Sequence, residues 1–185
     1  MSNDAIYLYS TIVALLALVA LVAAVGLTIY RLVKGPEGAG LLRGSAIWLA
    51  WIVALVATLG SLFYSEVIHF EPCRLCWFQR IAMYPMAIVL LVGAIRREYQ
   101  VKFYALPLAL TGLAISVYHY LIQHFPTLEG TSCNPDNPCS NIYVEMFGFI
   151  TIPFMAGAGF ILIAVLLAFY VNKAAVPKEA VRQEV

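Results

Sequence analysis

Five long runs of apolar residues, separated by short polar stretches, follow one another along the chain. They cover residues 6–32, 45–68, 78–95, 103–122 and 150–170. A helix needs about 20 residues to cross roughly 30 Å of hydrocarbon, and these runs are too long for the strands of a membrane barrel. Backbone groups in lipid must find their hydrogen bonds within the segment, so the pattern predicts five membrane-spanning helices.

The composition agrees with a membrane protein. Of the 185 residues 63% are apolar and 11% are charged, and the mean hydropathy is +0.88, whereas a soluble domain carries about 25% charged residues. The fold class predicted is therefore an all-α integral membrane bundle. The net charge is +1 and no basic patch stands out, so we expect no nucleic-acid partner.

The basic residues predict how the chain is oriented. Nine of the eleven follow the first, third and fifth runs: Arg31, Lys34, Arg43, Arg96, Arg97, Lys102, Lys173, Lys178 and Arg182. The positive-inside rule makes that side cytoplasmic, and the C-terminus with it. The first run lacks the basic start of a signal peptide, so we expect a retained anchor with its N-terminus outside. The opposite side then receives residues 70–77 and 123–149, and with them all four cysteines.

The four cysteines fall into two close pairs. Cys73 and Cys76 lie in the stretch PCRLC, and Cys133 and Cys139 in SCNPDNPC. Outside the cytoplasm thiols are oxidised, so disulfides persist there, and four cysteines allow three connectivities. Local pairing is sterically easy for both pairs, because the Asn-Pro steps between Cys133 and Cys139 favour a turn.

The first pair lies at the start of the third run. Pro72 suits the first turn of a helix, which would place Cys73 and Cys76 on one face near its N-terminus, where the helix dipole favours a thiolate. Arg80, one turn beyond Cys76, adds a positive charge. Because Gln79 and Arg80 are polar, we expect this first turn at the membrane surface. A cysteine at a helix N-terminus beside a positive charge is typically a reactive thiol.

Three kinds of protein fit these cysteines. C-x-x-C is half of many zinc sites, but the other pair has C-x5-C spacing and the compartment is oxidising, so no metal site is expected. Two structural disulfides could belong to a transporter or sensor. Thiol–disulfide exchange is the favoured function. A lipid-soluble quinone is the expected electron acceptor, because the sequence has no G-x-G-x-x-G fingerprint for a dinucleotide, and Trp77 follows Cys76 where haem attachment needs a histidine.

The stretches FEPCRLCWFQR, GTSCNPDNPCSN and GFITIP resemble the disulfide-bond formation protein B family, especially its BdbC branch. The resemblance covers roughly residues 45–170. It implies a four-helix membrane bundle, a thioredoxin-fold dithiol oxidase of the DsbA or BdbD kind as partner outside the cell, and a membrane quinone, either menaquinone or ubiquinone, as electron acceptor.

The same resemblance implies roles for six residues. Cys133 and Cys139 would exchange with the partner, Cys133 forming the mixed disulfide. Cys73 and Cys76 would lie beside the quinone, with Cys76 as the thiolate that contacts its ring. Arg80 would stabilise that thiolate and the quinone oxygen, and His119 would lie near the quinone head group.

The chain departs from better-known members in two ways. An extra apolar run precedes the four-helix core, and the second outer loop is too short for a long horizontal helix. We therefore divide the chain into an extra helix and loop (residues 1–44), the core (45–172) and a polar cytoplasmic tail (173–185). The sequence does not explain the role of the extra helix.

Overall fold

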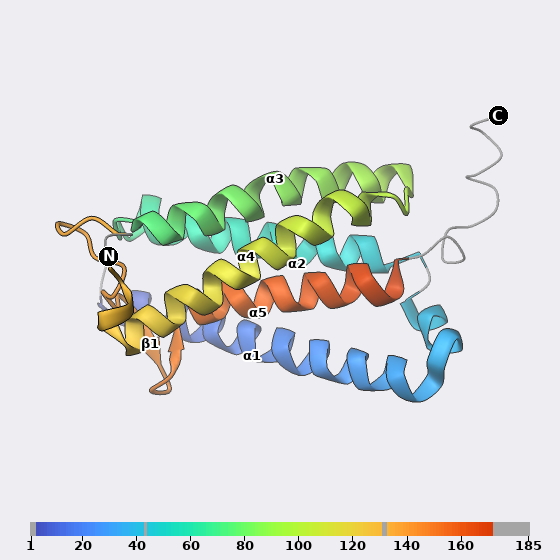
Figure 1. Cartoon of the computed structure of the whole chain (residues 1–185), viewed down its shortest axis with the longest axis horizontal. Coiled ribbons are helices and arrows are strands. Elements are labelled where there is room, and N and C mark those ends of the chain that lie inside the picture. The colour runs from blue at the N-terminus through green and yellow to red at the C-terminus, as the bar shows by residue number, and fades with distance from the viewer. Residues whose placement is uncertain (1–2, 43, 131–132, 172–185) are drawn as a thin grey trace.

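The computed structural model describes residues 3–42, 44–130 and 133–171, and shows five long helices side by side (Figure 1). The helices are α1 (Asn3–Lys34), α2 (Ala46–Leu62), α3 (Arg74–Arg96), α4 (Val101–His124) and α5 (Ile152–Val165). A 3-10 segment, Gly35–Leu42, follows α1, and π-helical turns extend α2 (Phe63–Val67) and α5 (Leu166–Tyr170). Each of the five is long and apolar enough to cross a membrane. The prediction of a five-span all-α membrane bundle is confirmed.

The helices α2 to α5 form the bundle predicted for the core. Each packs on the next in chain order, and α5 also packs on α2, whereas α1 lies against α5 on the outside. The segment between α4 and α5 holds a short 3-10 turn, Pro126–Leu128, and an antiparallel hairpin of β1 (Glu145–Met146) and β2 (Ile150–Thr151). The short loop that the sequence predicts thus contains no long helix in its described residues.

Hydrogen bonds tie α1 to the bundle at both of its ends. The Tyr9 hydroxyl donates to the Gly60 carbonyl at 3.1 Å, and the Tyr64 hydroxyl donates to Ser10 Oγ at 3.2 Å. At the other end the Tyr170 hydroxyl donates to the backbone oxygen of Leu27 at 2.6 Å. Polar groups buried among apolar helices need such partners, so α1 is a packed part of the molecule. The proposed division at residues 44 and 172 stays a prediction.

The two ends of the bundle differ in chemistry. The end of α1 and the turn from α3 to α4 lie at one end, and they carry Arg31, Lys34, Arg96 and Arg97. The segment before α3 and the loop after α4 lie at the opposite end, with the cysteines. Arg43, Lys173, Lys178 and Arg182 lie outside the described residues. The cysteines and the described basic turns are thus at opposite ends of the bundle, and which end faces the cytoplasm stays a prediction.

Close approach of α4 and α5 depends on one glycine. A Cβ atom on Gly112 would lie 2.3 Å from the ring of Phe160, which is fully buried in the core. Gly157 and Gly159 on α5 leave more room: the nearest contacts of a Cβ atom there would be 3.4 and 3.9 Å away. The tightest glycine contact in the described helices is therefore one that sequence reasoning missed.

Gly112→Ala is expected to lower the thermal stability of the protein in detergent, because the added methyl group collides with Phe160. Overpacking a core costs about 1–3 kcal/mol. Gly26→Ala is the matched control, since nothing lies within 4 Å of a Cβ there and alanine favours a helix. Equal melting temperatures for the two variants would contradict the predicted close contact.

Candidate redox site

All four cysteines gather at one end of the bundle. Cys73 and Cys139 are buried, at 4% and 0% exposure, and form one apolar cluster with Leu75 and Ile122, against which Cys76 and Cys133 pack. Cys73 and Cys76 are free thiols, and Cys133 and Cys139 form a disulfide. Of the three possible connectivities, the structure therefore contains the local bond of the second pair. The two pairs meet although they lie far apart in the sequence.

The start of α3 places the first pair. Cys73 is the residue that caps the helix, with an extended backbone (φ −66°, ψ 171°), and its sulfur accepts a hydrogen bond from the Cys76 backbone N–H at 3.5 Å. Pro72 therefore precedes the cap, and its expected place in the first turn was wrong. An N-cap side chain normally supplies an oxygen for this purpose. Here a sulfur occupies that position, facing the helix N-terminus.

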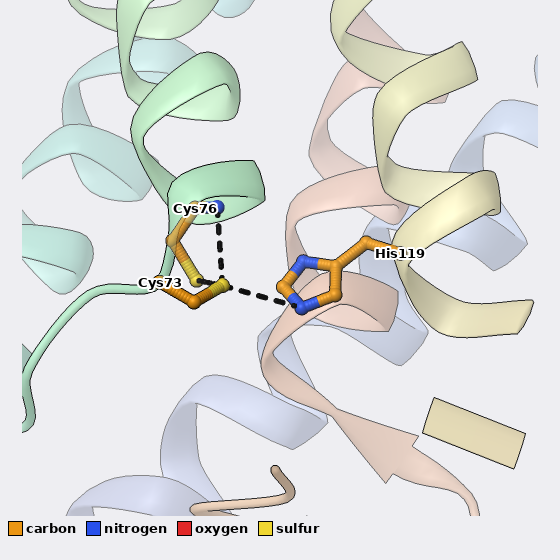
Figure 2. Close-up of side chains that lie close together, drawn as sticks. All are labelled: Cys73, Cys76 and His119. Carbon is orange, nitrogen blue, oxygen red and sulfur yellow. Dashed lines mark hydrogen bonds between the residues drawn. The ribbon is translucent and has the colours of Figure 1, made fainter. Parts of the chain in front are cut away.

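His119, from α4, contacts both cysteine pairs. Its Nε2 atom lies 3.6 Å from Cys73 Sγ and 3.1 Å from the backbone oxygen of Cys139. Figure 2 shows the imidazole ring pointing at the two sulfurs of Cys73 and Cys76, which lie 3.2 Å apart. The ring is 1% exposed. His119 is thus the side chain that bridges the dithiol and the disulfide.

These contacts lower the pKa of Cys73 to about 4. The hydrogen bond from the Cys76 thiol is the largest cause, burial opposes it, and His119 and the Cys76 backbone N–H add to the lowering. Each of these groups stabilises the thiolate more than the thiol. The sequence predicted a lowered pKa for a thiol at this helix start, and the structure places it on Cys73.

The reduced protein is expected to keep one cysteine thiolate at pH 6. A lowered pKa means that the thiolate is present above pH 4 and is lost as the pH falls through that value, whereas an ordinary cysteine ionises near about pH 8.5. Titration of the ultraviolet thiolate absorbance, with Cys133–Cys139 intact, measures this. Cys73→Ser should remove the low-pH transition. A midpoint near pH 8.5 would contradict the hydrogen-bonded arrangement.

Arg80 lies within the bundle, 9% exposed, and reaches toward α2. Its Nε donates to Ser61 Oγ at 3.0 Å and one terminal nitrogen donates to the Ser61 backbone oxygen at 3.1 Å, while its guanidinium lies 5.4 Å from the Trp77 ring centre. The other terminal nitrogen, NH1, forms no hydrogen bond with any described residue. Arg80 therefore has a donor left for another group, but no hydrogen bond to Cys76 within the described chain.

Gln79 is buried as well. Its side-chain nitrogen donates to Ser116 Oγ on α4 at 2.8 Å. Gln79 and Arg80 are thus both buried inside the bundle and paired with serines on neighbouring helices, and the expected depth of this first turn at the membrane surface stays a prediction. Burying a polar group requires such a partner.

The second pair is held by Glu129, which the sequence did not single out. Its two carboxylate oxygens accept hydrogen bonds from the Cys139 backbone N–H at 2.6 Å and from Ser140 Oγ at 2.8 Å. The Cα atoms of Cys133 and Cys139 are 5.9 Å apart. Cys139 is fully buried, while Cys133 is partly exposed. A lone acidic residue in a loop has no distinctive spacing, so no sequence signal could have found this role.

A membrane bundle that holds a disulfide and a dithiol in one cluster has the arrangement of a thiol–disulfide oxidoreductase. The sequence profile of the DsbB family, described as "Disulfide bond formation protein DsbB", matches residues 43–170. The chain belongs to this family of membrane disulfide-bond formation proteins. No solved structure matches the chain.

Similar proteins come from several bacilli. The chain is 47% identical over 122 residues to Disulfide bond formation protein C of Bacillus subtilis (strain 168), a match that covers 65% of this chain and 88% of the relative. It is 48% identical over 120 residues to a Probable disulfide formation protein of Oceanobacillus iheyensis, covering 64% and 83%. The resemblance inferred from the cysteine stretches is thereby confirmed, and α1 lies before the matched region.

Proposed function

We propose that the protein takes two electrons from a thioredoxin-fold dithiol oxidase of the DsbA or BdbD kind and passes them to a membrane quinone. The electrons enter at Cys133 and Cys139, move to Cys73 and Cys76, and leave to the quinone. The observation that carries this proposal is the contact of His119 with both cysteine pairs. In this way the protein would support disulfide formation in exported proteins.

Cys133 is the sulfur that the partner attacks. It lines an open hollow of about 300 Å³, together with Pro126, Glu129, Gly130, Asn134, Pro135 and Pro138. Cys139 is fully buried, so a protein thiolate reaches Cys133 first. The attack forms a mixed disulfide at Cys133 and releases Cys139 as the leaving thiolate.

Transfer between the pairs runs through Cys139 and Cys73, the two buried sulfur atoms of the cluster. Starting from an oxidised Cys73–Cys76 pair, the Cys139 thiolate attacks Cys73 and releases Cys76. The partner's second thiolate then attacks the partner sulfur of the mixed disulfide, so the partner leaves with its own disulfide and the Cys133 thiolate is freed. Cys133 in turn attacks Cys139 in the Cys139–Cys73 disulfide and releases Cys73 as a thiolate. Cys73 is a good leaving group because its thiolate is stabilised. The product is the state seen in the structure.

The residues beside Cys76 fit a quinone. Arg80 offers its NH1 donor, and the exposed rings of Trp77 and Phe78 provide an apolar surface on the same turn of α3. The reduced pair would supply a bound quinone with two electrons and with the proton of the Cys76 thiol, and the second proton would come from solvent. Arg80 would donate to the quinone oxygen, and His119 would hold Cys73 as a thiolate and lie near the head group. Menaquinone and ubiquinone both fit this description.

The orientation follows from the same proposal. The cysteine end of the bundle would face the outside of the plasma membrane, where the partner works and disulfides persist. The turns with Arg31, Lys34, Arg96 and Arg97 would face the cytoplasm. The N-terminus would then be outside and the C-terminus inside.

Cys139→Ser mixed with the oxidised partner is expected to trap a mixed disulfide at Cys133: the Cys133 thiolate attacks the partner's disulfide and releases one partner thiolate, and Cys139, which would resolve the new bond, is missing. Non-reducing electrophoresis followed by peptide mapping identifies the bonded cysteine. Cys133→Ser is the matched control and should trap much less. A partner bonded to Cys76 instead would mean that the two pairs act in the reverse order.

A further inference from the structure

The reduced dithiol and His119 together form a set of metal ligands. Cys73 Sγ, Cys76 Sγ and a ring nitrogen of His119 all lie within 4.8 Å of one another. Figure 2 shows the three side chains converging from α3 and α4. We propose that the reduced enzyme binds a thiophilic divalent cation, Zn²⁺ in nature, through Cys73, Cys76 and His119.

The distances are close to those of a zinc site. Tetrahedral zinc has Zn–S bonds of about 2.3 Å and Zn–N bonds of about 2.0–2.1 Å, so its ligand atoms lie about 3.5–3.8 Å apart. Cys73 Sγ and His119 Nε2 are 3.6 Å apart, and the two sulfurs are 3.2 Å apart. A small side-chain rotation that separates the sulfurs by about half an ångström is sufficient. The separation of Cys73 Sγ and His119 Nε2 therefore already fits a zinc ion, and Cys76 Sγ lies within 4.8 Å of a ring nitrogen of His119.

The charges also suit a divalent ion. Zn²⁺ with two thiolates and a neutral imidazole has no net charge, which suits a buried site. Both cysteines would bind the ion as thiolates, so binding releases the protons that they carry. His119 Nε2 would exchange its contact with the Cys139 carbonyl for the ion. Binding through Nε2 places the ring proton on Nδ1, which is buried without a partner among the described residues, so this N–H stays unpaired.

This ligand set differs from the one that the sequence argument rejected. That argument combined all four cysteines, but Cys133 and Cys139 are joined in a disulfide and cannot bind through thiolates. His119, 46 residues from Cys73, replaces them. Two cysteines and one histidine leave a fourth position open for water, as zinc sites with three protein ligands do.

The site exists in one oxidation state of the protein. A Cys73–Cys76 disulfide has no thiolates to offer, so oxidation excludes the cation and reduction creates its site. A bound ion occupies both sulfurs and keeps them from forming a disulfide. The cation would thus act as a reversible inhibitor that holds the enzyme in its reduced form.

Cadmium titration tests this proposal. The full-length Cys133→Ser/Cys139→Ser protein, purified and reduced, is titrated with Cd²⁺ while the ultraviolet cadmium–thiolate absorbance is recorded. We expect one Cd²⁺ per chain, displacement by excess Zn²⁺, and no binding after the Cys73–Cys76 pair is oxidised. His119→Leu should weaken binding by about tenfold or more. His124→Leu is the matched control, because His124 is exposed on the same helix, and it should leave the affinity unchanged.

Other outcomes overturn the proposal. If Cd²⁺ does not bind stoichiometrically, the proposed site does not exist. If His119→Leu binds Cd²⁺ with unchanged affinity, the two cysteines alone hold the ion and His119 is not a ligand. If His119→Leu does not fold, His119→Gln replaces it with a side chain of similar size. Because the titration uses neither quinone nor partner, its failure leaves the proposed electron path standing, and failure of the electron path leaves the metal site standing.

Discussion

Replacing Cys73 with serine is expected to abolish quinone reduction while the Cys133–Cys139 disulfide remains reducible by the partner. Cys73 is buried in one cluster with Cys139, and in the proposed path it is the thiolate through which the two pairs exchange. Serine retains the size of the side chain but is not a redox group. Removal of a reacting nucleophile costs on the order of a thousandfold or more in rate. Absorbance of the quinone and thiol labelling of each pair measure the two steps separately.

Cys73→Ser should therefore accumulate protein with reduced Cys133 and Cys139. Folding is checked by the melting temperature, since a residue that caps a helix also contributes to stability. Quinone reduction at the normal rate in Cys73→Ser would contradict the proposed route, because electrons would then have to reach Cys76 from the second pair directly.

Arg80→Met is expected to slow quinone reduction by about 10- to 100-fold, because hydrogen bonds from a charged group contribute about 1.5–3 kcal/mol each and about 1.4 kcal/mol is a factor of ten. Methionine keeps the apolar stem but loses both bonds to Ser61 and the NH1 donor. The first attack of the partner on Cys133 should keep its rate. Stopped-flow absorbance of the quinone and quenched labelling of Cys133 give the two rates.

Tyr84→Phe is the matched control for Arg80→Met. The Tyr84 hydroxyl also donates to Ser61 Oγ, at 3.2 Å, so its loss disturbs the same serine without removing a charge. We expect Tyr84→Phe to reduce quinone at nearly the normal rate. If both variants slow the reaction equally, Arg80 acts by holding α2 against α3 and does not assist the quinone.

The sequence was sufficient to predict the five helices and the end of the bundle that holds the cysteines. The bilayer fixes the length of each apolar run, so the number of spans can be counted from the pattern. The pairs Cys73 with Cys76 and Cys133 with Cys139 are also visible as spacing. The bounds were predicted less well: α3 begins at Arg74, four residues before the predicted run, because the capping residue Cys73 sets the start of the helix and an apolar count does not detect a cap.

The contacts that organise the site were not predictable, because they join residues far apart in the chain. His119 lies 46 residues from Cys73, and Arg80 binds Ser61 on another helix. The sequence suggested a role for His119 only through family resemblance and one for Arg80 from its place one turn beyond Cys76, and it missed Glu129 and Gly112. Which helix faces meet depends on the rotation of each helix in the bundle, and nearly uniform apolar runs do not specify that rotation.

The most direct test of the proposed electron path is the stoichiometry of quinone reduction by the purified protein. A reduced thioredoxin-fold dithiol oxidase is the donor, and the quinone and the partner's thiols are followed together. The proposed path predicts one quinone reduced for each partner dithiol oxidised, and none with Cys76→Ser. Partner oxidation without quinone reduction, or quinone reduction that persists in Cys76→Ser, would contradict it.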